Sequence, residues 1–174
     1  MNQIKERNVI GAIAVALADE INRVASSTAP EEGPAASALA LINHAPGISI
    51  RSLASGVGLT HAGTVRLVDR MEALGLIERR LNATDGRTRS LHLTSEGEVS
   101  CDSILRERDQ VITRGLSALT PEEQKTLGAL AERMLRAIVE DEAHAYRICR
   151  LCDYGSCNNC PVGDELESRD DKQV

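Results

Sequence analysis

The chain has 174 residues and a formal net charge of −6; hydrophobic residues make up 42% of it and aromatic residues 1%. With two Tyr and no Phe or Trp, the core must be aliphatic, and a single-strand nucleic-acid platform, which stacks bases on aromatic rings, is disfavoured. The length suits one ordinary domain, or a small domain with a helical extension. No apolar run approaches the roughly 18 residues of a membrane span and residues 1–7 open no signal peptide, so we expect a cytoplasmic protein with no membrane partner.

Positive charge is concentrated in one segment of this acidic chain. Residues 50–92 contain seven arginines and four acidic residues, a formal charge of +3, so the rest of the chain carries −9. A basic segment within an acidic chain is the distribution expected when one module faces nucleic acid.

The N-terminal segment, residues 1–34, is predicted to be a dimerisation helix followed by a linker. Its stripe of apolar residues, at spacings of three and four, consists of Ile10, Ile13, Leu17, Ile21 and Val24. A lone helix cannot bury such a stripe, so it must pack on segments distant in the sequence, and the C-terminal helices are the obvious partner.

Residues 35–97 are predicted to form a winged helix-turn-helix DNA-binding domain. A short helix supports two further helices, capped by Ser49 and Thr60, and two strands follow over residues 76–81 and 90–93. The buried stripe of the second capped helix is predicted to contain Val65, Leu67, Val68, Met71 and Leu74. Such a helix fits the roughly 12 Å major groove, while a basic hairpin beside it reaches the minor groove or the phosphates.

This geometry selects seven candidate DNA-binding residues. They are Thr60, His61, Thr64, Arg66 and Arg70 on the recognition helix, and Arg87 and Arg89 on the wing. Thr64, Arg66 and Arg70 are predicted to face the major groove, and the two wing arginines to contact phosphates or the minor groove. The alternative is an ordinary amphipathic helix pair followed by a hairpin with a solvated turn.

These residues resemble the winged helix-turn-helix of the MarR family of bacterial regulators, named for multiple antibiotic resistance. The matching stretches are PGISIRSLA, TVRLVDRMEALGLIERR and the wing DGRTR leading into LHLTSEG. The resemblance covers about residues 5–145 and implies a homodimeric regulator that binds double-stranded DNA. Gly63 within the recognition helix and the cysteine-rich tail depart from the family pattern.

Residues 98–146 are predicted to be C-terminal dimerisation helices. Thr94 caps a helix running to about Leu119, and Thr120-Pro121-Glu122-Glu123 begins another that continues to about Ala145. The expected fold is therefore mostly α with a small β wing: a winged helix-turn-helix domain with an N- and C-terminal helical dimerisation region.

The tail, residues 147–174, contains four of the five cysteines in the pattern C-x2-C-x4-C-x2-C: Cys149, Cys152, Cys157 and Cys160. Four soft ligands in two C-x2-C pairs indicate a metal centre. An iron-sulfur cluster is slightly favoured over Zn²⁺, because the last three cysteines have a ferredoxin-like spacing and a Pro follows the fourth. Disulfides or unmetallated thiols are the alternatives, and Cys101 is predicted to be a small core residue.

Taken together, these features predict a sequence-specific transcriptional regulator, acting as a repressor and a homodimer on an inverted-repeat operator. The cysteine centre would control its DNA affinity, and a small-molecule effector is left open as a further partner. The sequence contains no nucleophile-base pair, paired carboxylates or phosphate-binding glycine loop, so no enzyme is expected. The alternatives are a redox or electron-transfer protein, and a protein-interaction winged helix with a structural zinc site.

Overall fold

The computed structural model describes residues 3–31, 33–81, 89–157 and 159–170. In chain order its elements are α1 (Gln3–Thr28), α2 (Ala35–His44), α3 (Ile50–Val57), α4 (His61–Ala73), β1 (Ile77–Leu81), β2 (Arg89–Leu93), α5 (Ser95–Leu116), α6 (Pro121–Ile138), α7 (Glu142–Cys149), the 3-10 turn η1 (Tyr154–Ser156) and α8 (Pro161–Asp170). The predicted fold class, mostly α with a small two-stranded wing, is confirmed.

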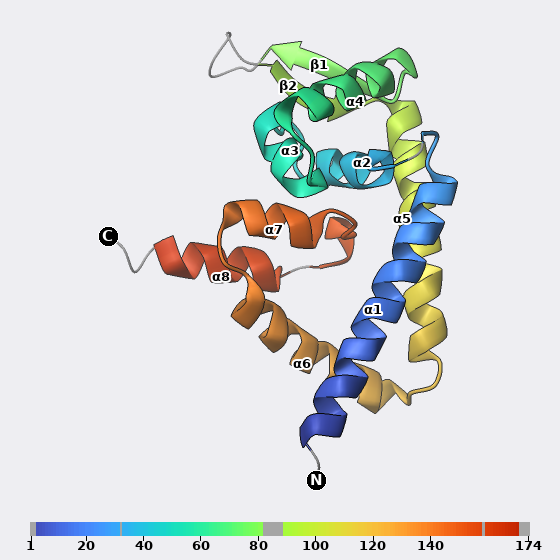
Figure 1. Cartoon of the computed structure of the whole chain (residues 1–174), viewed down its shortest axis with the longest axis vertical. Coiled ribbons are helices and arrows are strands. Elements are labelled where there is room, and N and C mark those ends of the chain that lie inside the picture. The colour runs from blue at the N-terminus through green and yellow to red at the C-terminus, as the bar shows by residue number, and fades with distance from the viewer. Residues whose placement is uncertain (1–2, 32, 82–88, 158, 171–174) are drawn as a thin grey trace.

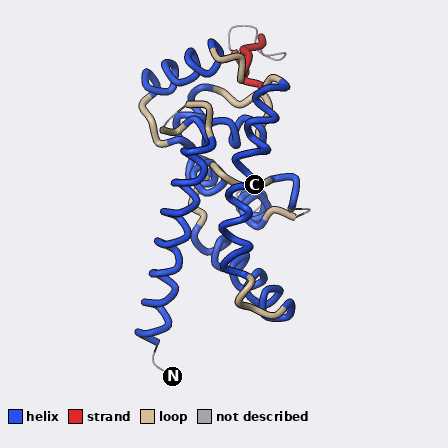
Figure 2. The backbone as a smooth tube through the Cα atoms, turned by 90° about the vertical axis from the view of Figure 1, so that its right-hand side faces the viewer, coloured by secondary structure: helices blue, strands red, loops and turns tan. Residues whose placement is uncertain are grey.

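The winged domain, formed by α2, α3, α4 and the two strands, lies at one end of the molecule (Figure 1). Helices α1 and α5 pack side by side into an arm that leads away from it. Figure 2 shows α1 running from beside the winged domain to the opposite end, where the N-terminus lies. Glu20 joins the two helices, since its carboxylate accepts from Arg23 of α1 at 2.7 Å and from Arg114 of α5 at 3.2 Å. These two guanidinium partners hold the pKa of Glu20 at about 2.

Four of the helices begin at the capping residues that the sequence predicts. The side chains of Ser49, Thr60 and Thr94 each accept a hydrogen bond from the backbone N–H three residues on, at 3.0 to 3.1 Å. Thr120 forms a full capping box with Glu123 at the start of α6. Each cap satisfies an N–H that the helix itself leaves unpaired, so the helix starts are fixed by local chemistry.

Gly75 turns the chain from α4 into the wing. Its φ is +71°, and its N–H bonds the carbonyl of Glu72 while that of Leu76 bonds Met71, which ends the helix in a left-handed cap. β1 then pairs antiparallel with β2, with Arg79 opposite Leu91 and Leu81 opposite Arg89. The segment between Leu81 and Arg89, with the predicted Asp-Gly turn, lies outside the described residues.

The core is aliphatic, as the composition requires. Its largest fully buried side chains include Leu39, Leu41, Ile42, Leu53, Leu67, Val68, Met71, Leu91 and Ile104. Cys101 is also fully buried there, which confirms it as a core residue. Leu74 is 53% exposed, contrary to the predicted stripe, because α4 ends at Ala73 and the backbone then turns away.

The prediction of one helix from residue 121 to about 145 was wrong. Val139 takes an extended conformation and is buried, and Asp141 caps a new helix by accepting from the N–H of His144 at 2.7 Å. The aspartate offers the backbone a bond that competes with continuing the helix. The predicted boundary at residues 146 and 147 consequently falls within α7.

Helix α8 was not predicted. Pro161 stands at its first position, where a missing N–H costs nothing. Cys160 precedes it, with its carbonyl accepting from Asp164 at 2.9 Å and its sulfur from the N–H of Gly163 at 3.5 Å. Within the ranges described above, no helix is both long enough and apolar enough to cross a membrane.

Gly97 is the glycine of the LTSEG stretch, and we expect Gly97→Ala to destabilise the protein by about 1 to 3 kcal/mol or more. An added Cβ would lie 1.9 Å from the carbonyl oxygen of Leu76, a backbone atom that also accepts from Thr94. The matched control is Gly115→Ala in the same helix, where nothing lies within 4 Å; it should stabilise by about 0.5 to 1 kcal/mol. Urea unfolding measures both, and equal midpoints would contradict this close packing.

Candidate functional site

Helix α4 presents the surface that the sequence assigns to the major groove. Thr60 and His61 are exposed at its start, and Arg66 is exposed one turn further on. The N–H of Gly63 bonds Thr60, and a Cβ there would lie only 3.2 Å from the hydroxyl oxygen of Thr60. The small residue therefore keeps the first turn of α4 open around its cap.

Thr64 corrects one of the predicted contacts. It is fully buried, and its hydroxyl donates to the carbonyl of Thr60 at 3.0 Å. Thr64, Leu67, Val68 and Met71 stand at positions i, i+3, i+4 and i+7, the buried face of one helix. A hydroxyl satisfied within the helix can occupy this face, so Thr64 supports α4 rather than reading a groove. The spacing was visible in the sequence, but the polar side chain concealed it.

The arginines of the winged domain divide into paired and unpaired groups. Arg70 is paired with Glu31, Arg79 with Asp69 and Glu72, and Arg80 with Glu78. Among the described residues, no carboxylate pairs with the arginines that remain, which are Arg51, Arg66 and Arg89. Arg87 lies outside the described residues.

The ion pairs reduce the positive charge that the basic segment, residues 50–92, can offer to DNA. Arg79 and Arg80 contribute to the formal charge but are offset by neighbouring carboxylates on α4 and β1. The Arg70 side chain is 54% exposed, whereas that of its partner Glu31 is only 17% exposed, so Arg70 is accessible but its charge is offset by this carboxylate. Within the part of the winged domain that the structure describes, the arginines without a carboxylate partner therefore lie on α3, on α4 and at the start of β2.

The four tail cysteines gather around α7 and the loop that follows it. Cys149 is buried, Cys152 and Cys160 are half-buried, and Cys157 is exposed; all four are free thiols. Burial, together with the negative charges that the other three would carry, raises the pKa of Cys149 to about 12. The pKa of Cys152 is also raised by burial, against the lowering effect of Arg108 on α5. The four sulfurs are thus close enough to interact electrostatically.

The four cysteines are the right ligand types for a soft metal, but their side chains are not arranged around a common point. Four thiols in two pairs are the donor set of zinc and iron-sulfur sites. Within the described part of the chain, however, no three His, Cys, Asp or Glu side chains converge as ligands. Binding a metal would require the loop between Cys152 and Cys160 to draw the sulfurs together.

The helix that carries Cys149 packs against the helix-turn-helix. Arg147 Nε of α7 donates to the carbonyl of Ser55 at 3.3 Å. A Cβ at Gly56 of α3 would lie 3.1 Å from Cβ of Tyr146 and 2.4 Å from a methyl group of Leu41, so glycine allows this close approach without a shift of either neighbour. The long helix expected to lead to Cys149 from a dimer interface is therefore replaced by a short helix seated on α3 (Figure 1).

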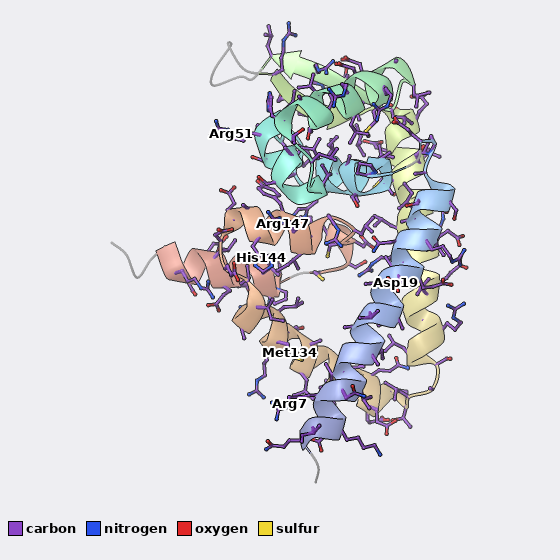
Figure 3. The ribbon with its side chains drawn as sticks, in the orientation of Figure 1. Arg7, Asp19, Arg51, Met134, His144 and Arg147 are labelled. Atoms are coloured by element: carbon purple, nitrogen blue, oxygen red, sulfur yellow. The ribbon has the colours of Figure 1, made fainter. Side chains whose placement is uncertain are left out.

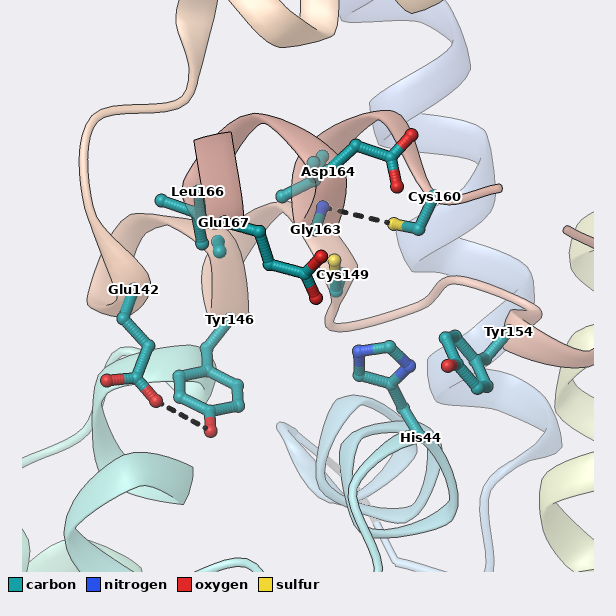
Figure 4. A pocket seen from close by; sticks show the side chains of 12 residues that line it. His44, Glu142, Tyr146, Cys149, Tyr154, Cys160, Gly163, Asp164, Leu166 and Glu167 are labelled. Atoms are coloured by element: carbon teal, nitrogen blue, oxygen red, sulfur yellow. Dashed lines mark hydrogen bonds between the residues drawn. The ribbon is translucent and has the colours of Figure 1, made fainter. Parts of the chain in front are cut away.

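A hollow of about 400 Å³ lies between α2, α7 and α8. Figure 4 shows Cys149 and Cys160 on one side of it and His44 with Tyr154 on the other. The two rings meet edge to face at 4.5 Å, and burial lowers the pKa of His44. The sequence predicted no role for these two residues, since a lone His and a lone Tyr carry no spacing signal.

Comparison with known proteins agrees with this architecture. The profile of the MarR family matches residues 32–88. The HTH-type transcriptional repressor MdtR of Bacillus subtilis (strain 168) is 28% identical over 95 residues, 55% of this chain and 61% of MdtR, so the chain spans about three fifths of that relative. The transcriptional regulator HosA of Escherichia coli is 33% identical over 90 residues, 52% of this chain and 67% of HosA.

A mutant of MepR from S. aureus, bound to an oligodeoxyribonucleotide, shares the fold, with a TM-score of 0.52 at 17% identity over 77% of this chain and 98% of that one. On this evidence the chain belongs to the MarR family.

Proposed function

We propose that the protein is a sequence-specific DNA-binding transcriptional regulator. The observation that carries the proposal is the exposed face of α4, where His61 and Arg66 have no carboxylate partner among the described residues. Beside it, the second strand of the wing begins at Arg89, which likewise has no carboxylate partner in the described part of the chain. In the major groove, Arg66 can donate two hydrogen bonds to one guanine, which reads sequence. Thr60, Arg70 and Arg87 complete the proposed surface.

We also propose that the regulator is a homodimer. Helix α6 buries none of its residues within this chain, and its apolar side chains are 45% to 51% exposed: Leu127, Leu130, Met134 and Ile138. Helix α1 likewise exposes Val9, Ile10, Ile13 and Val15 by 49% to 62%. An apolar surface of this kind favours a second copy, and two-fold symmetry then places two α4 helices on an inverted-repeat operator.

Repression is the expected output, since a dimer seated on an operator blocks access to the DNA beneath it, and the relative MdtR is named a repressor. The hollow between α2, α7 and α8 is large enough for a small-molecule effector.

We further propose that Cys149, Cys152, Cys157 and Cys160 hold an iron-sulfur cluster or Zn²⁺ that sets DNA affinity. When bound, the centre supplies positive charge that offsets four thiolates. Because the pKa of Cys149 and of Cys152 is raised, binding of the centre has to release their protons, and its positive charge has to offset the resulting thiolates. Because α7 carries Cys149 and packs on α3, a structural change at the centre can be transmitted directly to the helix-turn-helix.

The unpaired arginines are expected to carry the electrostatic part of DNA binding. Arg89→Ala should weaken binding on all sequences and lower the slope of log affinity against log salt by about 1. Arg80→Ala, on the neighbouring strand, is the matched control: Glu78 already offsets its charge, so its slope should hardly change. Fluorescence anisotropy from about 50 to 200 mM salt measures both. Equal slopes for the two variants would overturn the division into paired and unpaired arginines.

Two-fold symmetry predicts the form of the operator. Footprinting of the DNA upstream of the gene should show an inverted repeat with half-sites about one helical turn apart. Protection of a single half-site by a monomer would rule out the proposed dimer.

The cysteine centre is tested by composition and by affinity together. Anaerobically purified protein should contain iron or zinc; Cys152→Ser and Cys157→Ser should lose it, while Cys101→Ala, a cysteine outside the cluster, should keep it. Loss of the centre should change operator affinity by about 5- to 150-fold. Absence of metal from the parent would end the proposal of a centre, and equal affinities with and without metal would leave it purely structural.

A further inference from the structure

A second hollow, of about 560 Å³, opens on the surface where α3, the start of α4 and α7 meet. Its polar lining comes from Arg51 and Ser55 of α3, Thr60 and His61 at the start of α4, and Arg147 of α7. Figure 3 labels Arg51 and Arg147 on the same side of the molecule, one on each of the two packed helices. The hollow thus joins the helix-turn-helix to the cysteine-bearing helix.

The charge of this hollow is positive and uncompensated. Arg51 and Arg147 are both exposed, and no acidic residue is among the described residues that line it. The carbonyl of Ser55 accepts from Nε of Arg147 at 3.3 Å, which fixes the guanidinium beside the end of α3. Its two terminal nitrogens have no hydrogen-bond acceptor among the described residues, so they can serve an external anion.

We infer that this hollow binds a phosphate of the DNA backbone and that Arg147 is a DNA contact supplied from outside the winged domain. The inference rests on the proposed DNA-binding function, because Thr60 and His61 on its rim begin the helix assigned to the major groove. A strand bordering that groove places its phosphates next to the helix start. Two guanidinium groups suit such a phosphate, since each can form paired, charge-assisted hydrogen bonds with its oxygens.

This site ties DNA binding to the cysteine cluster by a direct path. Arg147 and Cys149 lie two residues apart on α7, which rests on α3 through the close contact of Tyr146 with Gly56. Any rearrangement of the cysteine loop that shifts α7 also shifts Arg147 away from the phosphate. Affinity would then fall on all DNA sequences alike, because a backbone contact carries no base information.

The test compares Arg147→Gln with Arg106→Gln, an equal loss of charge at an exposed residue of α5. Binding of the full chain to an operator fragment and to random DNA of the same length is measured from about 50 to 200 mM salt. Arg147→Gln should bind both DNAs about tenfold more weakly. Its affinity should fall about threefold less over that salt range, the loss of one phosphate contact. Arg51→Gln should act similarly, and Arg106→Gln should match the parent.

Arg147→Lys separates charge from folding. If the phosphate contact is real, Lys restores most of the salt slope, whereas a variant that merely undocks α7 gains nothing from the restored charge. Parental affinity and slope in both Arg147→Gln and Arg51→Gln would overturn the phosphate site while leaving the regulator intact. Failure of the parent itself to bind DNA would instead defeat the proposed function.

Discussion

The close contact between α7 and α3 is the constraint on which the rest of the arrangement depends. Gly56 has no side chain, so Tyr146 can approach the helix-turn-helix at a distance that a Cβ would crowd, since that Cβ would lie 3.1 Å from Cβ of Tyr146. Arg147 adds a hydrogen bond to the carbonyl of Ser55 beside it. Once α7 is seated there, α8 packs back on α6, where Arg136 pairs with Asp164 at 3.0 Å. The C-terminal segment therefore packs against α3 and leaves the apolar face of α6 exposed.

Ion pairs within the chain decide which arginines of the winged domain remain available to DNA. The chain is acidic overall, and its own carboxylates offset Arg79 and Arg80 on the wing. Among the described residues of the winged domain, the arginines without a carboxylate partner are Arg51, Arg66 and Arg89, and Arg147 of α7 joins them. A few free arginines on a negative body favour one orientation on DNA and limit adhesion through other faces. Formal charge counted along the sequence cannot show this, because pairing depends on the fold.

Much of the fold could be predicted because local chemistry determines it. The caps at Ser49, Thr60, Thr94 and Thr120 and the left-handed Gly75 act within a few residues, so their positions are visible in the sequence. Apart from α8, which begins at a local signal in Pro161, the features that were not predicted depend on contacts distant in sequence or on side chains with ambiguous chemistry. Thr64 is polar but satisfied inside its own helix; the break at Val139 is set by burial as much as by Asp141; and the docking of α7 joins residues about ninety positions apart. The cysteine spacing predicts which four residues could be ligands. Whether their sulfurs come together depends on the conformation of the loop between them, which the spacing does not fix.

The central claim is that events at the cysteines reach the DNA-binding helices through the contact of α7 with α3. Hydrogen exchange of backbone amides tests it directly, by comparing the anaerobically purified parent with its Cys157→Ser variant. Cys157 is exposed and distant in sequence from α3, and α7, which carries Cys149, packs on α3, so we expect an effect on α3 to pass through α7. We predict faster exchange in Ile50–Val57 as well as in Glu142–Cys149 of the variant. Exchange that changes only between residues 150 and 160, with α3 identical in the two proteins, would contradict the account.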